Sequence, residues 1–300
     1  MEGDDRRQRL GRRRRRVQLM NPAVVAAIGG AQMSLMTAAA AGGFAFANAE
    51  AAAVVAAMVN PPDDARKQLI DDLVGALKSG ATSGSDIWAK LDLLYILAAA
   101  DQQAALLDWK GGGFDGAITG TGTFTADRGW QGDGASGYID TGFNPTTAPA
   151  PNYALNSAHI WLWSRTSGQD STANDMGASS QLEMGVRSSS DSANFTINSS
   201  IGGIGHQNVV LSQIDGSGLF MLNRSGNSTE EAYRNGVPLT FTSGARTSSG
   251  IPNSNITIGM KDGQFSLRQF AAAGVGGSLN AAEALDLYNA LQAYMTGVGA

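Results

Sequence analysis

A glycine-rich stretch over residues 129–142 holds the residue types that best suit ligand binding. Trp130 offers a flat apolar face, and Asp133 and Tyr138 offer polar groups close to it in the chain. Proteins hold a saccharide ring by combining an aromatic platform with a few polar side chains and backbone groups. We therefore predict a ligand-binding site at Trp130, Asp133 and Tyr138. The alternative, that Trp130 only plugs the end of the fold, stays open.

A second group of residues lies on a predicted strand over 157–164. Alternation places two sets of side chains on opposite faces, which are Ala158, Ile160 and Leu162 on one and His159, Trp161 and Trp163 on the other. One face must point into the core, so the other needs cover from the chain's own helices, a neighbouring subunit or a sugar ring. The large area of an indole favours protein cover. We predict an assembly face at His159, Trp161 and Trp163.

Catalytic chemistry finds little support. A glycoside hydrolase needs two carboxylates flanking the scissile bond, yet Glu183 stands alone and the neighbours Glu230 and Glu231 point to opposite faces of a strand. The chain has no cysteine and two histidines, His159 and His206, and no Gly-x-Ser-x-Gly motif. A thiol nucleophile is thereby excluded, and a histidine-based metal cluster nearly so.

Glycine-rich and acidic loops give no cofactor signal either. The stretches 120–124 and 202–205 are not followed by the helix that a phosphate-binding loop requires. Asp133, Asp140 and Asp262 lie on predicted loops, where lone solvated carboxylates are more common than calcium ligands. We expect no enzyme activity, no metal and no cofactor.

The elements that position these residues fall into three segments. The pattern of residues 61–110 predicts a helical hairpin followed by a turn. The first helix begins at a cap, Asp63 or Asp64, and ends at Gly80. A second helix runs from Ser85 to about Ala99, and a third short one from Asp101 to Asp108. Trp88 and Trp109 could bind a ligand, but at helical spacing we expect them in a core. A closing helix begins at the capping-box pair Asn280 and Glu283.

Over residues 111–277 the spacing of apolar residues changes from a helical period to the alternation of β-strands. Short alternating segments, separated by Gly, Asn, Asp, Ser and Pro, recur in the pattern of an antiparallel sandwich. Asn235-Gly236 predicts a tight hairpin turn between two of them. We predict one antiparallel jelly-roll sandwich over 111–300, with the closing helix packed on it as part of the same unit.

The first sixty residues differ from the rest in charge. Residues 1–16 carry eight arginines and three acidic residues, which gives them a net charge of +5. The whole chain has a net charge of −5, so residues 17–300 have a net charge of −10. The stretch 17–49 is uncharged and rich in Ala and Gly. We rank an uncleaved attachment arm over 1–60 first, a signal peptide ending near Glu50 second and a membrane anchor third.

Several stretches of the sequence resemble segments of known protein families. Ala232 to Val237, Ile256 to Gly259 and the closing segment Leu279 to Tyr288 are similar to the hairpin and last strands and helix of laminin-G-like and concanavalin-A-like jelly rolls. The segments 65–70, 87–95 and 124–134 resemble a module of phage and prophage tail-fibre-like structural proteins. Together these stretches cover roughly residues 61–296.

The resemblance implies a virion structural or adhesion subunit of tail-fibre, spike or decoration type. Its arm would dock to other virion proteins, the protein would form a homotrimer, and the sandwich would face outward to bind a cell-surface glycan, with no specific nucleic acid involved. The alternative is a secreted bacterial protein that binds or cleaves glycans and has a signal peptide over 1–49.

Overall fold

The computed structural model describes residues 43–170, 174–188, 190–199, 208–242 and 246–300. The chain divides into two units, Met1–Ala45 and Phe46–Ala300. Every helix and strand described here belongs to the second unit. The predictions for residues 1–42, which include most of the arm, the signal peptide and the membrane anchor, and the prediction for His206 lie outside the described residues.

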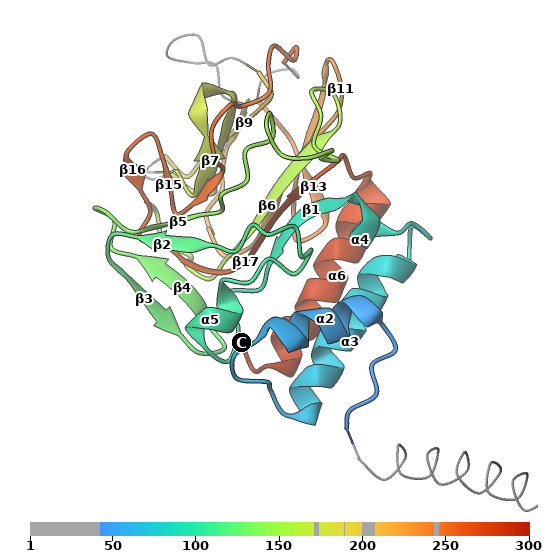
Figure 1. Cartoon of the computed structure of the whole chain (residues 1–300). Coiled ribbons are helices and arrows are strands. Elements are labelled where there is room, and N and C mark those ends of the chain that lie inside the picture. The colour runs from blue at the N-terminus through green and yellow to red at the C-terminus, as the bar shows by residue number, and fades with distance from the viewer. Residues whose placement is uncertain (1–42, 171–173, 189, 200–207, 243–245) are drawn as a thin grey trace, which may run out of the picture. The chain divides into compact units, whose positions relative to one another are not determined.

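The second unit is an antiparallel β-sandwich (Figure 1), as the sequence predicts. One sheet, here called the covered sheet, has the order β13-β12-β11-β6-β17-β4-β3, and β1 also pairs with β17. Its strands are β1 (Leu91–Tyr95), β3 (Gly122–Thr125), β4 (Gly129–Gly132), β6 (Ala158–Ser164), β11 (Gly218–Gly226), β12 (Thr229–Arg234), β13 (Val237–Leu239) and β17 (Gln269–Gly276).

The second sheet has the order β10-β9-β8-β7-β14-β5-β2. Its strands are β2 (Ala117–Thr119), β5 (Tyr138–Asp140), β7 (Met176–Ala178), β8 (Leu182–Gly185), β9 (Ala193–Ile197), β10 (Asn208–Val210) and β14 (Thr257–Ile258). A small hairpin, β15 (Met260–Lys261) and β16 (Gln264–Phe265), forms a separate two-stranded ladder next to β7 of the second sheet. A 3-10 turn, η1 (Ser179–Gln181), links β7 and β8.

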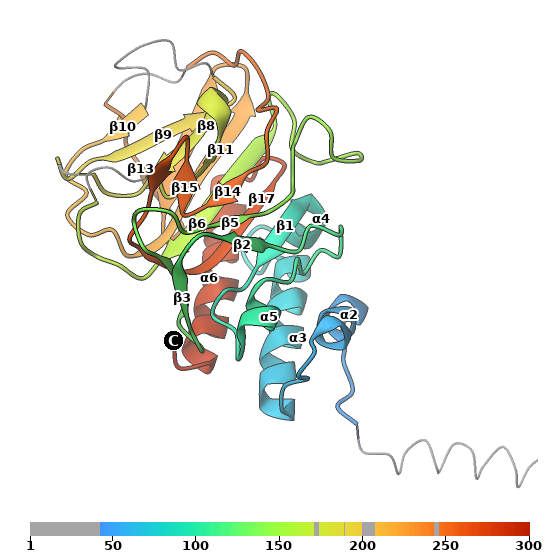
Figure 2. The ribbon, with the colours of Figure 1, turned by 60° about the vertical axis from the view of Figure 1, so that its left-hand side comes forward.

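The helices form a layer of their own. They are α2 (Ala49–Ala57), α3 (Asp64–Ser79), α4 (Ile87–Lys90), α5 (Gln102–Ala105) and α6 (Ala281–Gly297). The helix α3 packs against both α2 and α6. Figure 2 shows α6, α3 and α2 in that order from left to right, and in Figure 1 α2 crosses in front of the other two. The unit is therefore a three-layer structure with two sheets and one layer of helices.

Two hydrophobic cores hold these layers together. The core between the sheets joins Ile160, Leu162 and Phe220 of the covered sheet to Met184 and Phe195 of the second sheet. The other core joins the opposite face of the covered sheet to the helices, and it contains Trp161, Met221, Leu73, Leu77, Leu287 and Leu291. The central strands of the covered sheet are thus buried on both faces, which is why β6 is buried at every residue, while the edge strands β3 and β13 stay largely exposed.

The predicted turn at Asn235-Gly236, the caps at Asp63 and Asn280 and the stop at Gly80 are confirmed. Asn235 and Gly236 have φ angles of 51° and 75°, the left-handed pair that a tight hairpin between β12 and β13 requires. Asn280 and Glu283 form the capping box of α6, and Asp63 accepts the Arg66 N–H at the start of α3. Gly80 ends α3 in a left-handed conformation, with φ of 52°.

The predicted second helix of the hairpin is wrong beyond Lys90. Asp86 rather than Ser85 caps α4, which stops after four residues, and the chain continues as β1. The strand pairs with β17 in the covered sheet and is buried at Leu91, Leu93, Leu94 and Tyr95. A strand buried on both faces shows no alternation, so its apolar run looks the same as a helical stripe.

The predicted boundary of the arm also differs from the structure. Residues 46–60 belong to the compact unit, and α2 buries Ala51, Val54 and Val55 against the helical layer. Asp71 of α3, which is 4% exposed, accepts the backbone N–H groups of Ala47 and Asn48 at 2.7 and 2.9 Å. The helical pair that precedes the sandwich is therefore α2 with α3.

None of the helices in the described part of the chain combines the length and the apolar character that crossing a bilayer demands.

Candidate functional site

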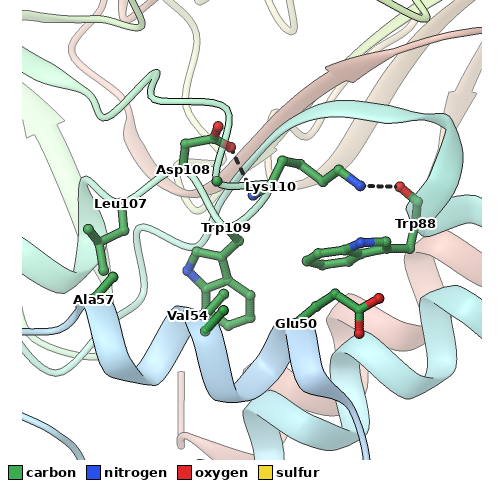
Figure 3. Close-up of a pocket in the computed structure, with 10 residues that line it drawn as sticks. Glu50, Val54, Ala57, Trp88, Leu107, Asp108, Trp109 and Lys110 are labelled. Atoms are coloured by element: carbon green, nitrogen blue, oxygen red, sulfur yellow. Dashed lines mark hydrogen bonds between the residues drawn. The ribbon is translucent and has the colours of Figure 1, made fainter.

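A small cavity lies between α2 and the loop over residues 107–111 (Figure 3). Its volume is about 160 Å³, and its walls are Glu50, Ala53, Val54, Ala57, Trp88, Leu107, Asp108, Trp109, Lys110 and Gly111. Pockets for drug-sized ligands measure roughly 300–1,000 Å³. The cavity therefore suits one ring or one short group, and we take it as the candidate site.

Helix caps and backbone hydrogen bonds set the positions of these walls. Asp86 accepts the Ala89 N–H and so begins α4, which carries Trp88. The Trp109 N–H donates to the Leu94 carbonyl at 2.9 Å, which ties the loop to β1. On the other side α2 is held by the ion pair of Glu50 with Lys78, at 2.8 Å.

Neighbouring side chains hold the two indole rings, Trp88 and Trp109, in place. Trp109 meets Tyr294 of α6 edge to face, with ring centroids 6.0 Å apart. The Lys110 ammonium lies 4.3 Å from the centre of the Trp88 ring and donates to the Trp88 carbonyl at 2.6 Å. Only 7% of Trp88 and 4% of Trp109 is exposed. Both rings are thus fixed before any ligand arrives, and both are core residues, as the sequence predicts.

Asp108 organises the loop. Its carboxylate accepts the backbone N–H groups of Lys110 and Gly112, each at 3.0 Å, and more distantly that of Leu94. Burial raises the pKa of Asp108 to about 6, and the three N–H groups oppose that rise only in part. Burial also lowers the pKa of Lys110, against the attraction of Asp108 and other nearby carboxylates.

The cavity has few groups free for catalysis. Both oxygens of Glu50 accept from the Lys78 ammonium, and this hydrogen bond keeps the pKa of Glu50 below its usual value. Asp108 is bound by the loop backbone. No set of three or more His, Cys, Asp or Glu side chains in the described ranges could hold a metal ion. The arrangement can bind a group, but it offers no unengaged acid–base pair.

The carboxylates that the sequence weighed for glycoside hydrolysis have structural partners. Glu183 accepts from Lys261 at 2.9 Å, and Glu230 pairs with Arg224 where neither side chain is exposed. Glu231 accepts from Asn223 at 2.9 Å. The hydrogen bonds and ion pairs of these three carboxylates thus stabilise the fold.

The predicted ligand site at Trp130 is wrong. Trp130 is 1% exposed and lies in the core between the sheets, where a Cβ on Gly122 would collide with its indole. Its ring is therefore unavailable to stack on a sugar. The alternative, in which Trp130 packs inside the sandwich, is what the structure has.

Asp133 and Tyr138 lie nearer the surface, but they do not form a site with Trp130. The Asp133 carboxylate accepts the N–H groups of Ala135, Ser136 and Gly137, and these bonds keep its pKa low. Tyr138 lies against Phe265 with ring centroids 6.2 Å apart. Asp133 thus stabilises a turn, and the aromatic platform predicted at Trp130 is not available beside it.

The predicted assembly face is also wrong. His159 and Trp161 are fully buried, Trp163 is 7% exposed, and the cover is the helical layer of the same chain. Trp163 stacks on Tyr288 of α6, with centroids 5.8 Å apart. Burial lowers the pKa of His159 to about 4, so the neutral ring donates its Nδ1–H to the Gly277 carbonyl. Protein cover was expected, but it comes from within the chain.

No known protein family matches the chain, and no curated protein matches its sequence. Several solved structures are similar in part. The sialidase of Trypanosoma rangeli in complex with 2,3-difluorosialic acid is 12% identical, with a TM-score of 0.44, over 75% of this chain and 39% of that one. The binding domain of botulinum neurotoxin DC in complex with rat synaptotagmin II is 15% identical, with a TM-score of 0.47, over 69% and 52%.

A third similar structure is domain 4 of a GH43 extracellular arabinanase from Geobacillus stearothermophilus, in complex with arabinotriose. It is 17% identical, with a TM-score of 0.38, over 66% of this chain and 98% of that domain. The chain spans about two fifths of the sialidase and half of the neurotoxin domain. What these proteins bind or cleave is a property of those proteins.

Proposed function

We propose that this protein is a non-enzymatic binding protein that holds the end of a glycan chain in the cavity between α2 and residues 107–111. The observation that carries the proposal is the pair of fixed indoles, Trp88 and Trp109, in the wall of a cavity sized for one ring. Aromatic walls with a few polar groups at the rim are how proteins commonly hold small ligands.

The proposal excludes hydrolysis on chemical grounds. Cleavage of a glycosidic bond needs one carboxyl group as an acid and a second that is free as base or nucleophile. In this cavity Glu50 is held by Lys78 and Asp108 by the loop backbone. A ligand end would therefore be bound without being cut.

The resemblance to tail-fibre-like proteins suggests the setting. In a virion, the basic N-terminal arm would dock to other virion proteins and the sandwich would face outward as part of a trimer. The secreted alternative needs cleavage near Glu50, which would remove Ala47 and Asn48, the residues that satisfy buried Asp71. These contacts favour a chain that keeps residues 47 and 48, as the virion setting requires. Intact mass of the native protein from purified particles distinguishes the two.

Filling the cavity is the direct test of binding. Ala53 and Ala56 are both exposed on α2, but only Ala53 lines the cavity. Both substitutions to Phe cost a similar helix propensity, about 0.5 kcal/mol. On an array of immobilised oligosaccharides, we expect Ala53→Phe to lose about tenfold or more of the wild-type affinity and Ala56→Phe to keep it.

Three results would count against the proposal. They are a wild-type protein that binds no glycan on the array, equal binding by the Ala53→Phe and Ala56→Phe variants, and release of reducing ends from any polysaccharide by the wild-type protein. The first two reject the site or the ligand class. The third rejects the absence of enzyme activity.

A further inference from the structure

The charged groups around the cavity carry an excess of negative charge. Four carboxylates attract the Lys110 ammonium in the cavity wall, namely Asp108, Asp86, Asp92 and Glu50. The ammonium groups that attract Glu50 in return are those of Lys78 and Lys110. Four carboxylates against two ammonium groups leave an excess of two negative charges. Surroundings of this kind attract cationic ligands and repel anionic ones.

Glu50 is the carboxylate in the wall that a ligand can reach. Its side chain is 35% exposed, whereas Asp108 is buried and its carboxylate is occupied by the N–H groups of the loop. The Glu50 oxygens accept from the Lys78 ammonium at 2.8 and 2.9 Å and from the backbone N–H of Glu50 itself. A carboxylate has about four acceptor positions, so one remains for a donor in the cavity.

The ring of Trp88 separates Glu50 from Lys110. Figure 3 shows the ring nearly edge on, with the Lys110 side chain on one side of it and Glu50 on the other. The Lys110 ammonium, 4.3 Å from the ring centre, covers the first face. The second face is turned toward Glu50, which lines the cavity as Trp88 does. An indole face attracts a cation, and the attraction grows where water is excluded.

This end of the cavity distinguishes the charges that sugar substituents carry. A carboxylate would be repelled by Glu50 and by the negative edge of charge around it. A hydroxyl or an acetamido group is neutral, so it gains nothing from the surrounding charge. A protonated amine gains a charge-assisted hydrogen bond to Glu50 and a cation–π contact with Trp88. Lys110 opposes this cation only weakly, because it lies across the ring and is itself surrounded by carboxylates.

We propose, on the basis of the proposed function, that the glycan end bound here is an amino sugar with a free, protonated amine. The amine donates to the Glu50 carboxylate and lies against the face of Trp88 that Lys110 leaves open. The sugar ring packs on Trp109 and on the α2 side chains Ala53 and Val54. The charge of the amine is thus the property that determines specificity.

Matched monosaccharides test this proposal. Glucosamine and galactosamine are titrated against the full chain beside glucose and galactose, which carry a hydroxyl in place of the amine. We expect at least one amino sugar to bind about tenfold or more tightly than its parent sugar, because it gains a hydrogen bond between charged groups. N-acetylglucosamine, in which the amine is capped and neutral, should bind within about threefold of glucose. Calorimetry at millimolar sugar gives the dissociation constants.

Two variants that break the same ion pair distinguish a ligand contact from a structural role of Glu50. Glu50→Gln keeps the size of the side chain and removes its charge, so the preference for the amine should fall to about threefold or less. Lys78→Gln removes the partner and keeps Glu50, so the preference should persist or increase. Glu50 and Lys78 are each about one third exposed, and such a pair contributes little to stability, so we expect both variants to fold.

The outcomes separate this inference from the proposed function. Equal binding of amino sugars and parent sugars, with both lost in Ala53→Phe, overturns the amine assignment and leaves the glycan site in place. A preference that survives Glu50→Gln, or that falls equally in Glu50→Gln and Lys78→Gln, also overturns the assignment. Sugar binding that is unchanged by Ala53→Phe overturns the site itself.

Discussion

Asp108 links the stability of the protein to pH. Burial raises its pKa from 3.8 to about 6, so the folded state holds the proton more tightly than the unfolded chain does. The stabilisation that results is complete below the unfolded pKa and is lost as pH rises through the folded pKa. The pH window is therefore from about 4 to 6.

The prediction concerns Asp108→Asn, which cannot titrate. The variant starts with a constant penalty, because its NH₂ group meets backbone N–H donors. Between pH 4 and 6, however, the wild type should lose up to about 3 kcal/mol relative to the variant, from a shift of roughly two pKa units. Urea unfolding of both proteins at several pH values measures this. Parallel stability curves for the two proteins would show that Asp108 is not the titrating group.

At the residue scale, the sequence predicts the roles that local chemistry decides. The caps at Asp63 and Asn280 and the turn at Asn235-Gly236 depend on neighbours in the chain, and all three are confirmed. Trp130 and Trp109 both lie close to glycines in the sequence, Trp130 directly after Gly129 and Trp109 two residues before Gly111. Which of them lines a cavity depends on α2 and the two sheets, and the chain around each residue does not contain that information.

At the element scale, burial on both faces explains the main error. The covered sheet lies between the second sheet and the helices, so β1 and β6 lose the alternation that identifies a strand. For β6 the flanking turns still indicate a strand. For β1 the preceding turn of helix and the run Leu91–Tyr95 continue one apolar stripe, and nothing local marks the change.

The helix α2 yields the prediction at this scale. A chain that starts at Gly43 keeps α2, whereas a chain that starts at Pro61 loses Val54, Val55 and Met58, all buried. Burial of three such side chains contributes roughly 5 kcal/mol. We therefore expect the shorter chain to melt about 10 °C or more below the longer one. The arm as predicted over 1–60 requires instead that both chains melt within a few degrees of each other, so thermal melts of the two decide the matter.

At the scale of the whole molecule, the helical layer changes where an assembly contact can lie. The aromatic face of β6 is covered by α6 and the rest of that layer, so it cannot join subunits. The large apolar side chains exposed in the described ranges are few and scattered over separate segments, namely Val59, Leu211, Ile214, Val237 and Leu267. Single exposed apolar residues are normal for a monomer.

We therefore expect any trimer of the kind that the tail-fibre resemblance implies to depend on the N-terminal arm. We expect the chain from Gly43 to be a monomer at micromolar concentration and the full chain to be a trimer, both measured by multi-angle light scattering. The arm carries eight arginines, and their mutual repulsion weakens with added salt. The trimer should thus persist or strengthen in 0.5 M salt. A trimeric chain from Gly43 would place the contact on the sandwich or its helices, and a monomeric full chain would leave the trimer without support.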